Sequence, residues 1–337
     1  MKVRIMNKVV RKMTRNATNR LLQHAKKAKS DEFYTQLSDI ARELKFYKDH
    51  FKDKVVYCNC NDPRRSNFYT YFVSNFHDLG LKKLITACYQ EAEGGLFGPA
   101  TAAKGFFYEY TGRREETACP GPADFTYFRG DGDFRSSESI KLLELADIVV
   151  TNPPFSLFRE YVAQLVRYRK KFLIIGNINA ITYKEIFHLI QENKAWLGVN
   201  LGRGISGFIV PDHYELYGTE ARIDAGGRRI VSPNNCLWLT NLDVSKRHED
   251  IALEKRYAGH EAEYPKYDNF DGINVDKTQN IPKDYAGCMG VPITFLHKFN
   301  PDQFEIVRFR KGDDGKDLSV NGKCPYFRIL IRNKRVR

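Results

Sequence analysis

Apolar and polar residues alternate along the first half of the chain in a pattern that separates short strands from amphipathic helices. Apolar runs of strand length predict buried strands at 54–59, 81–88, 125–129, 147–151 and 171–177. Between them, apolar residues at helical spacing predict helices at 37–52, 66–78, 136–146, 156–169 and 182–193. Strands and helices that alternate at this spacing predict an α/β fold with a parallel, doubly wound sheet.

Two regions depart from this pattern. Residues 91–124 are rich in Gly, Pro and charged residues, which indicates an irregular insertion. After residue 195, segments 207–210 and 236–242 are typical of strands without intervening helices, and 243–337 is aromatic, basic and rich in loop-forming residues. We therefore expect a Rossmann-like half followed by a more irregular half.

The composition indicates a packed protein. Hydrophobic residues make up 42% of the 337 residues, which is enough for a core and excludes a disordered chain. No apolar run approaches the length that crosses a bilayer, so we expect no membrane partner. The seven cysteines include no Cys-x-x-Cys pair. This favours free thiols in a reducing cytoplasm over disulfides or a metal site.

Positive charge is concentrated at the two ends of the chain. Residues 1–29 contain ten Lys or Arg and no acid, and residues 328–337 contain five and no acid. These ends carry +15 against a net charge of +13, which leaves −2 for the rest. Residues 15–29 predict a short basic helix. Such ends suit a phosphate backbone, although solvated tails or, for the first segment, an organellar targeting peptide have the same composition.

The tetrapeptide Asn152-Pro153-Pro154-Phe155 directly follows a predicted strand, and ligands of a doubly wound sheet bind at the carboxyl ends of its strands. The two prolines remove two N–H donors, so the loop offers carbonyl oxygens as acceptors. The Asn152 side chain adds another acceptor, and Phe155 adds a flat apolar face. A planar base with an amino group fits this set, because two acceptors draw the nitrogen toward tetrahedral character and free its lone pair for attack on a methyl group. An ordinary helix-entry turn is the structural alternative.

The segment DIVVTNPPF (147–155) resembles motif IV of the amino-methyltransferases. From about Arg15 to the C-terminus, the chain is similar to the EcoRI-type DNA adenine-N6 methyltransferases, a type II restriction-modification family. The similar segments include RNATNRLLQHAKKAKSDEFYTQ (15–36), DKVVYCNCNDPR (53–64), GDGDFRSSESI (130–140), 181–224, SPNNCLWLTNLDV (232–244), GVPITFLHKFNP (290–301) and NGKCPYFRILI (321–331).

This resemblance implies a Rossmann-like class I fold that binds S-adenosyl-L-methionine, with an added, more irregular DNA-recognition region. It implies double-stranded DNA as substrate and methylation of adenine N6 on a base flipped out of the helix, at the second adenine of GAATTC. The modification would protect DNA from a cognate restriction endonuclease. We expect a bacterial cytoplasmic, nucleoid-associated enzyme with no obligate protein partner and no metal.

The resemblance also implies roles for individual residues. Asn152 and the Pro153 carbonyl would accept hydrogen bonds from the target amino group, Pro154 would brace the loop, and Phe155 would stack on the adenine. The DEFYT segment resembles the motif that holds the methionine end of the cofactor, although Ser30 or Asp31 as a helix N-cap explains it equally. Its cofactor-binding candidates are Asp31, Phe33, Tyr34 and Thr35.

The loop after the first strand departs from the family pattern. It reads Cys58-Asn59-Cys60-Asn61-Asp62 and lacks the glycines that let a backbone approach a cofactor. We expect Asn59, Asn61 or Ser66 to provide the tight geometry, since Asn tolerates positive φ. Further cofactor-binding candidates are Cys58, Asn59, Tyr89 as a stacking residue, Asp133 with Phe134 as an acid–aromatic pair, and Asp131 as the alternative acid.

Basic and amide side chains supply the candidates for DNA binding. Phosphate contacts are expected in the N-terminal arm, and base contacts among the glycines of 200–235 and in the 243–280 region. The DNA-binding candidates are Arg11, Lys12, Arg15, Arg20, Lys26, Lys27, Arg203, His213, Arg222, Arg228 and Asn234. We expect a basic arm at 1–30, a catalytic domain at 31–200 and 230–245, and a recognition region at 200–230 and 245–337.

Other readings of the chain keep part of this chemistry. A methyltransferase that acts on cytosine N4, an RNA base or protein glutamine would use the same kind of loop to bind its target amino group. Pro211-Asp212 followed by Glu220-Ala221-Arg222 is weakly similar to a metal-dependent nuclease pattern that lacks its Lys. The alternative that is not an enzyme is a DNA-binding protein with a degenerate cofactor site.

Overall fold

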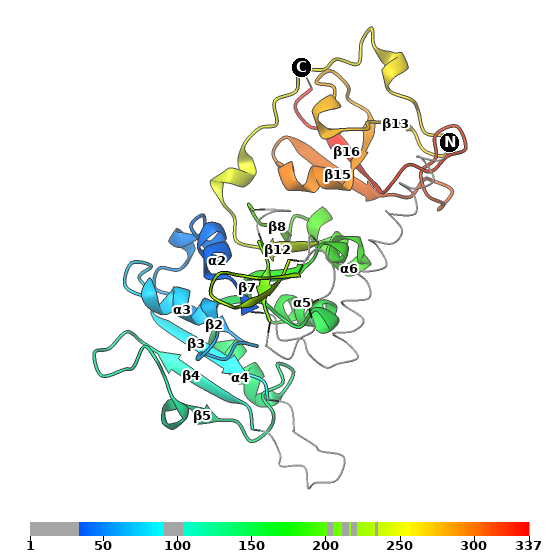
Figure 1. The fold of residues 1–337 in the computed structure, drawn as a ribbon. Coiled ribbons are helices and arrows are strands. Elements are labelled where there is room, and N and C mark those ends of the chain that lie inside the picture. Colours follow the sequence, from blue (N-terminus) through cyan, green and yellow to red (C-terminus); the bar gives the residue numbers. More distant parts are fainter. Residues whose placement is uncertain are drawn as a thin grey trace, which may run out of the picture. The chain divides into compact units, whose positions relative to one another are not determined.

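The computed structural model describes residues 34–90, 104–200, 205–210, 216, 221–232 and 235–336 (Figure 1). The chain divides into two compact units. Unit 1 comprises Met1–Ala180 and Asn200–Leu242, and unit 2 comprises Ile181–Val199 and Asp243–Arg337. Residues 181–199, which the pattern alone assigned to the catalytic half, therefore group with the C-terminal segment.

The main sheet of unit 1 has parallel strands at its centre and antiparallel strands at its edges. Within the unit its order is β5-β4-β3-β2-β6-β7-β12. Its strands are β2 (Val55–Cys58), β3 (Lys83–Cys88), β4 (Phe106–Tyr110), β5 (Thr126–Tyr127), β6 (Ile148–Thr151), β7 (Lys171–Asn177) and β12 (Cys236–Thr240). The pairs β2–β3, β2–β6 and β6–β7 are parallel, whereas β3–β4, β4–β5 and β7–β12 are antiparallel.

The expectation of a wholly parallel sheet is therefore wrong at the edges. Strand β4 lies inside the segment that we expected to be irregular, and the predicted strand at 125–129 shortens to the two residues of β5. The aromatic residues explain the extra strand, because Phe106 stacks on Phe125 with ring centroids 4.3 Å apart.

One helix precedes the first strand of the main sheet, and three others lie between its strands. They are α2 (Leu37–Leu44), α3 (Asn67–Ser74), α4 (Ser137–Leu145) and α5 (Phe158–Arg167). Ser66 and Ser136 are N-caps whose side chains accept from the backbone N–H groups of Tyr69 and Ser139. Several predicted helices are shorter than expected because short 3₁₀ helices replace their ends, as η1 (Lys48–His50) does after α2.

A second, small sheet in unit 1 joins segments that lie far apart in the sequence. Its antiparallel order is β1-β9-β11-β10, formed by β1 (Tyr34–Thr35), β9 (Phe208–Ile209), β11 (Arg229–Val231) and β10 (Ala221–Ile223). Thr35 pairs with Phe208, and Phe208 pairs with Val231. Tyr34 and Thr35, the described residues of DEFYT, therefore pair with the region that follows residue 200.

Unit 2 is more regular than its sequence suggested. Its sheet has the order β13-β14-β16-β15. The elements are α6 (Lys184–Gln191), β8 (Trp196–Leu197), β13 (Gly272–Asn274), β14 (Cys288–Pro292), β15 (Phe304–Phe309) and β16 (Arg328–Asn333). Helix α6 packs on β15, where Phe187 and Phe309 stack at 4.8 Å and the Gln191 side chain donates to Val307 O at 2.7 Å.

The basic C-terminus belongs to this sheet and does not form a free tail over residues 328–336. Arg328 is buried and pairs with Asp276 at 3.2 Å. Arg332 pairs with Glu305 at 3.1 Å, and Arg335 pairs with Asp250 at 2.9 Å. These guanidinium groups are therefore engaged in ion pairs within the fold, and a phosphate contact by this end stays a prediction.

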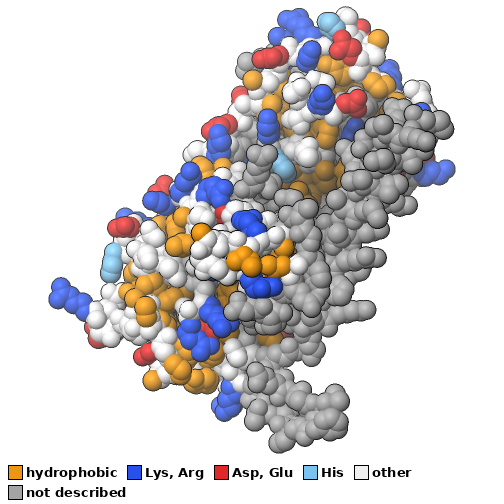
Figure 2. All heavy atoms as spheres, viewed as in Figure 1, with side chains coloured by type: hydrophobic (Ala, Val, Ile, Leu, Met, Phe, Trp, Pro, Cys, Tyr) orange, Lys and Arg blue, Asp and Glu red, His pale blue; other side chains and the backbone are white. Residues whose placement is uncertain are grey.

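The described surface carries mixed charges, and the cysteines form no disulfide. On the face drawn in Figure 2, Lys and Arg side chains are interspersed with Asp and Glu side chains in both units. All seven cysteines are free, and Cys58, Cys88, Cys236 and Cys288 are buried. Among the described residues, no helix is both long and apolar enough to cross a membrane.

Candidate active site

The NPPF loop lies at the carboxyl edge of the parallel strands in unit 1. Because β2, β3 and β6 are parallel neighbours, the segments after Cys58, Cys88 and Thr151 meet at that edge. Pro153 is buried and Phe155 is partly exposed at the start of the 3₁₀ helix η3 (Phe155–Leu157), which leads into α5. The Pro154 carbonyl accepts a hydrogen bond from Leu157 N–H at 3.0 Å and fixes this turn.

A buried hydrogen-bond network joins the NPPF strand to the loop after β2. The Thr151 hydroxyl donates to the backbone carbonyl of Asn59. The Asn61 side-chain amide donates to the same carbonyl at 2.7 Å and to Thr151 Oγ1 at 2.6 Å. Ser66 Oγ donates to Asn61 Oδ1 at 2.8 Å. The loop after β2 and the end of β6 are thus held in a single arrangement.

Tyr161 extends this network into the helix that follows NPPF. Its side chain is fully buried in α5, and its hydroxyl donates to Asn59 Oδ1. Burial raises the pKa of the Tyr161 hydroxyl well above its usual value, so it remains a donor at neutral pH. The ring of Phe134 packs edge-on against Tyr161 with centroids 5.1 Å apart.

The glycine-free loop makes its tight turn at a residue that we did not predict. Cys60 has a φ of 60°, whereas Asn59 and Asn61 are absent from the positive-φ residues of the described chain. The two asparagines instead supply side-chain hydrogen bonds, and Asn61 N–H donates to Ala87 O of β3 at 2.8 Å. The expectation that Asn59 or Asn61 takes the positive φ is therefore wrong, because their side chains are needed in the network.

The described part of DEFYT lies beside this loop. The Asn67 side chain, in the first turn of α3, donates to Thr35 O at 2.8 Å. Thr35 is 3% exposed, and its hydroxyl has no hydrogen-bond partner among the described residues. A buried hydroxyl of this kind is poised for a polar ligand. Tyr34 precedes it in β1, while the candidates Asp31 and Phe33 lie outside the described residues.

The acid–aromatic candidates lie at the end of β3. Gln90 N–H donates to Asp131 O at 2.9 Å, which places the 131–134 loop next to Tyr89, a residue with 44% of its surface exposed. Arg135 pairs with Asp133 at 2.6 Å, and this hydrogen bond lowers the pKa of the Asp133 carboxyl. Asp131 Oδ1 accepts from Asp133 N–H at 3.0 Å. Asp133 is therefore ionised at neutral pH and already shares its oxygens with Arg135.

The rings of Phe134 and Phe155 differ in how far they are exposed. Phe134 is 4% exposed and faces Tyr161, so its ring belongs to the core. Phe155 is partly exposed and meets Phe208 of β9 edge-on with centroids 6.0 Å apart. Of the two rings, that of Phe155 keeps the larger exposed surface, and Phe208 of β9 contacts it at one side.

The DNA-binding candidates are described only in part. Arg222, in β10, is exposed but donates to Ser232 Oγ at 2.6 Å and to Ser206 O at 3.3 Å. Arg228 pairs with Asp224 at 2.7 Å. The remaining candidates lie outside the described residues: Arg11, Lys12, Arg15, Arg20, Lys26, Lys27, Arg203, His213 and Asn234.

Sequence reasoning missed two of the residues that hold the site together, and it gave Ser66 only a role in the tight turn. Thr151 and Tyr161 carry no motif of their own, and their contacts span up to 102 positions of sequence. The available signal was a polar residue at the end of an otherwise apolar strand, as Thr151 is in IVVT. Such a residue needs a buried partner.

Comparison with known proteins identifies the family of this chain. Residues 21–334 match the family model described as "Adenine-specific methyltransferase EcoRI", and the chain belongs to this family. It is a site-specific, adenine-specific DNA methyltransferase.

Three relatives illustrate the match. The chain is 67% identical over 325 residues to the type II methyltransferase M.EcoRI of Escherichia coli, covering 96% of this chain and 100% of that protein. It is 37% identical to M.MpnI of Mycoplasma pneumoniae, over 92% and 97% of the two chains. It is 36% identical to M.MgeORF184P of Mycoplasma genitalium, over 93% and 98%. No solved structure matches the chain.

Proposed function

We propose that this enzyme transfers a methyl group from S-adenosyl-L-methionine to N6 of the second adenine in GAATTC, on a base flipped out of duplex DNA. The likeness to M.EcoRI supports the choice of site. The observation that carries the proposal is the hydrogen bond from Thr151 to the Asn59 carbonyl, because it brings a cofactor-type loop against the NPPF strand. In a bacterium, the modification protects DNA from a cognate restriction endonuclease.

The residues at the sheet edge fit the proposed cofactor. The turn at Cys60 has the positive φ that a cofactor-loop glycine commonly adopts, and the buried Thr35 hydroxyl has no hydrogen-bond partner among the described residues. The Asp133 carboxylate and the exposed Tyr89 ring suit an adenosine moiety. When bound, S-adenosyl-L-methionine supplies a methyl group on a positively charged sulfur. The mixed α/β sheet is compatible with a Rossmann-like class I arrangement.

The NPPF residues supply the catalytic contacts. Asn152 Oδ1 and the Pro153 carbonyl accept the two N–H bonds of the adenine amino group and hold its lone pair toward the methyl donor. Pro154 keeps the turn rigid, and Phe155 stacks on the flipped base. No base is needed before the attack, because the nucleophile is neutral and loses its proton during or after transfer.

The assignment of each function to a region of the chain stays a prediction. We assign the cofactor and the chemistry to unit 1, and DNA recognition to the 200–230 region and the C-terminal segment. Residues 1–30 act as a phosphate-binding arm. We expect the enzyme in the bacterial cytoplasm with the nucleoid, without an obligate protein partner.

A transfer assay tests the proposal. Duplex DNA is incubated with tritiated S-adenosyl-L-methionine and then digested to nucleosides. The proposal predicts label in N6-methyladenine alone. Label in cytosine, in RNA or in protein, or DNA binding without any transfer, supports one of the rival readings instead.

A further inference from the structure

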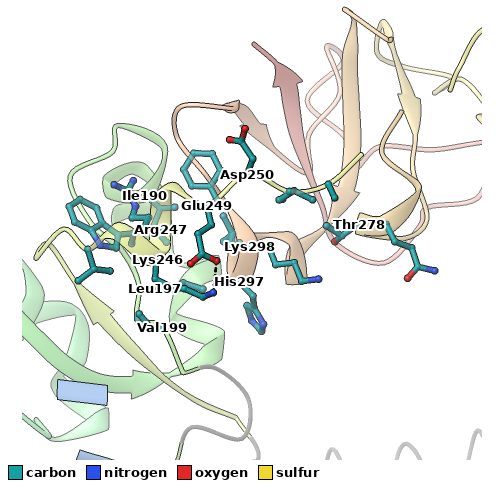
Figure 3. A pocket seen from close by; sticks show the side chains of 18 residues that line it. Ile190, Leu197, Val199, Lys246, Arg247, Glu249, Asp250, Thr278, His297 and Lys298 are labelled. Atoms are coloured by element: carbon teal, nitrogen blue, oxygen red, sulfur yellow. Dashed lines mark hydrogen bonds and ion pairs between the residues drawn. The ribbon is translucent and has the colours of Figure 1, made fainter. Parts of the chain in front are cut away.

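Unit 2 contains a cavity of about 430 Å³ whose lining has an apolar part and a cationic part (Figure 3). Ile190 and Leu296 contribute buried apolar surface, joined by Leu197 of β8. Lys298, which also lines the cavity, is exposed. Cavities of this size hold small ligands or parts of larger ones.

The charges around the cavity do not cancel. The acids that line it are already paired, Glu249 with Lys246, and Asp250 with Arg335 at 2.9 Å. In contrast, Lys298 and its neighbour His297 have no hydrogen-bond or ion-pair partner within the described chain. Burial lowers the pKa of His297, so its ring is a neutral donor or acceptor at pH 7. The surplus is therefore positive and is carried by Lys298.

Arg247, which also lines the cavity, is held by several contacts. The Arg247 guanidinium stacks on the Trp196 ring at 3.9 Å, donates to Asn193 Oδ1 and pairs with Asp243 at 3.3 Å. Its side chain is 7% exposed. Since Arg247 is held by these contacts, it forms part of the cavity wall, whereas Lys298 is the exposed cation of the lining.

We propose that this cavity seats one sugar–phosphate segment of the DNA backbone, with the phosphate on Lys298 and His297 and the deoxyribose against the apolar lining. DNA backbone alternates an anionic phosphate with a largely apolar sugar, which matches the two parts of the lining. This inference rests on duplex DNA being the substrate of the proposed function. The contact strengthens binding without reading sequence, because every nucleotide presents the same backbone.

Equilibrium binding of fluorescent duplexes by the full-length protein, measured over a series of salt concentrations without cofactor, tests this site. Lys298→Ala should weaken binding about 3–10-fold at low salt and make the plot of log affinity against log salt shallower by about 1. The loss should be equal for a GAATTC duplex and a scrambled duplex. Lys298→Arg should restore the slope, and His297→Ala should give a smaller loss.

Lys316→Ala is the matched control, because it removes an exposed lysine of the same unit that does not line the cavity. Its affinity and salt slope should equal those of the wild type. Melting curves for each variant identify any that fail to fold. An unchanged slope in folded Lys298→Ala, or a loss confined to the GAATTC duplex, overturns the proposal. A wild type that binds DNA yet transfers no methyl group contradicts the proposed function and leaves this test readable.

Discussion

The carboxyl edge of the main sheet and the cavity of unit 2 differ in whether their polar side chains have hydrogen-bond partners among the described residues. At the sheet edge, Thr151, Asn61 and Tyr161 bond to one another or to Asn59, and all of these groups are buried or nearly so. Around the cavity, Lys298 and His297 have no partner among the described residues. The first arrangement fixes geometry in advance, as methyl transfer requires. The second keeps a cation available for a partner that arrives from solution.

The largest effect is expected at Asn152, next to this network, which we propose accepts a hydrogen bond from the target adenine. Asn152→Ala removes one of two acceptors for the amino group, so the rate of methyl transfer should fall about 10²–10³-fold, by analogy with the loss of a single oxyanion-hole donor. Single-turnover transfer measures this, and duplex binding by the same variant should stay near the wild-type value. A variant that fails to fold, or that loses binding in proportion, would support a structural role for NPPF.

A smaller effect is expected one step away from the chemistry. Tyr161→Phe leaves the buried Asn59 Oδ1 without its donor and should lower the free energy of unfolding by about 1–3 kcal/mol. Because Asn59 is in the proposed cofactor loop, KM for S-adenosyl-L-methionine should rise more than kcat falls. Tyr168→Phe, at the partly exposed end of α5, is the control. Equal stability and KM in the two variants would show that the network does not position the loop.

The N-terminal arm should affect DNA affinity and leave chemistry unaltered. Deleting residues 1–14 removes five Lys or Arg residues, so binding should weaken and its salt dependence should become shallower. For every phosphate that the shortened protein no longer neutralises, the slope should fall by about 0.9. Titrations at several salt concentrations measure this. A fall in the transfer rate at saturating DNA would instead give the arm a part in the chemical step.

The smallest effect concerns the pH dependence of stability. Arg135 lowers the pKa of Asp133, so the pair stabilises the fold above the unfolded pKa of about 3.9, and this stability is lost as pH falls through the lower folded pKa. The free energy of unfolding of Arg135→Ala at pH 7 should therefore be lower than that of the wild type. The difference should be no more than about 1 kcal/mol, because the pair is partly exposed. The difference should vanish at acid pH. A constant difference across pH would mean that Arg135 acts through packing.

The sequence predicted the centre of the fold better than its edges. Strands β2, β3, β6 and β7 are buried apolar runs flanked by helices, and their pattern is local. Strand β4 and the sheet of unit 2 depend on pairing between segments that are separated in the sequence, such as Phe304 with Asn333. Their Gly-rich and aromatic surroundings hide the alternation of apolar and polar residues. Local periodicity cannot identify a partner that lies elsewhere in the chain.

The candidate site also has features that the local sequence predicts and features that it does not. The position of NPPF after a strand follows from residues 147–155 alone. The left-handed turn at Cys60 does not, because a residue other than glycine adopts that conformation only when surrounding contacts hold it there. The partners of Asn59 and Asn61 lie on β6, α3 and α5, which only the folded chain brings together.

Protection from restriction cleavage tests the central claim most directly. Duplexes containing GAATTC, or the same bases in scrambled order, are incubated with the enzyme and S-adenosyl-L-methionine and then exposed to an endonuclease that cuts GAATTC. We predict that GAATTC becomes resistant only when enzyme and cofactor are both present, with N6-methyladenine at the second adenine of each strand. Full cleavage of GAATTC after incubation with enzyme that binds the duplex, or methylation at another base or sequence, would contradict the account.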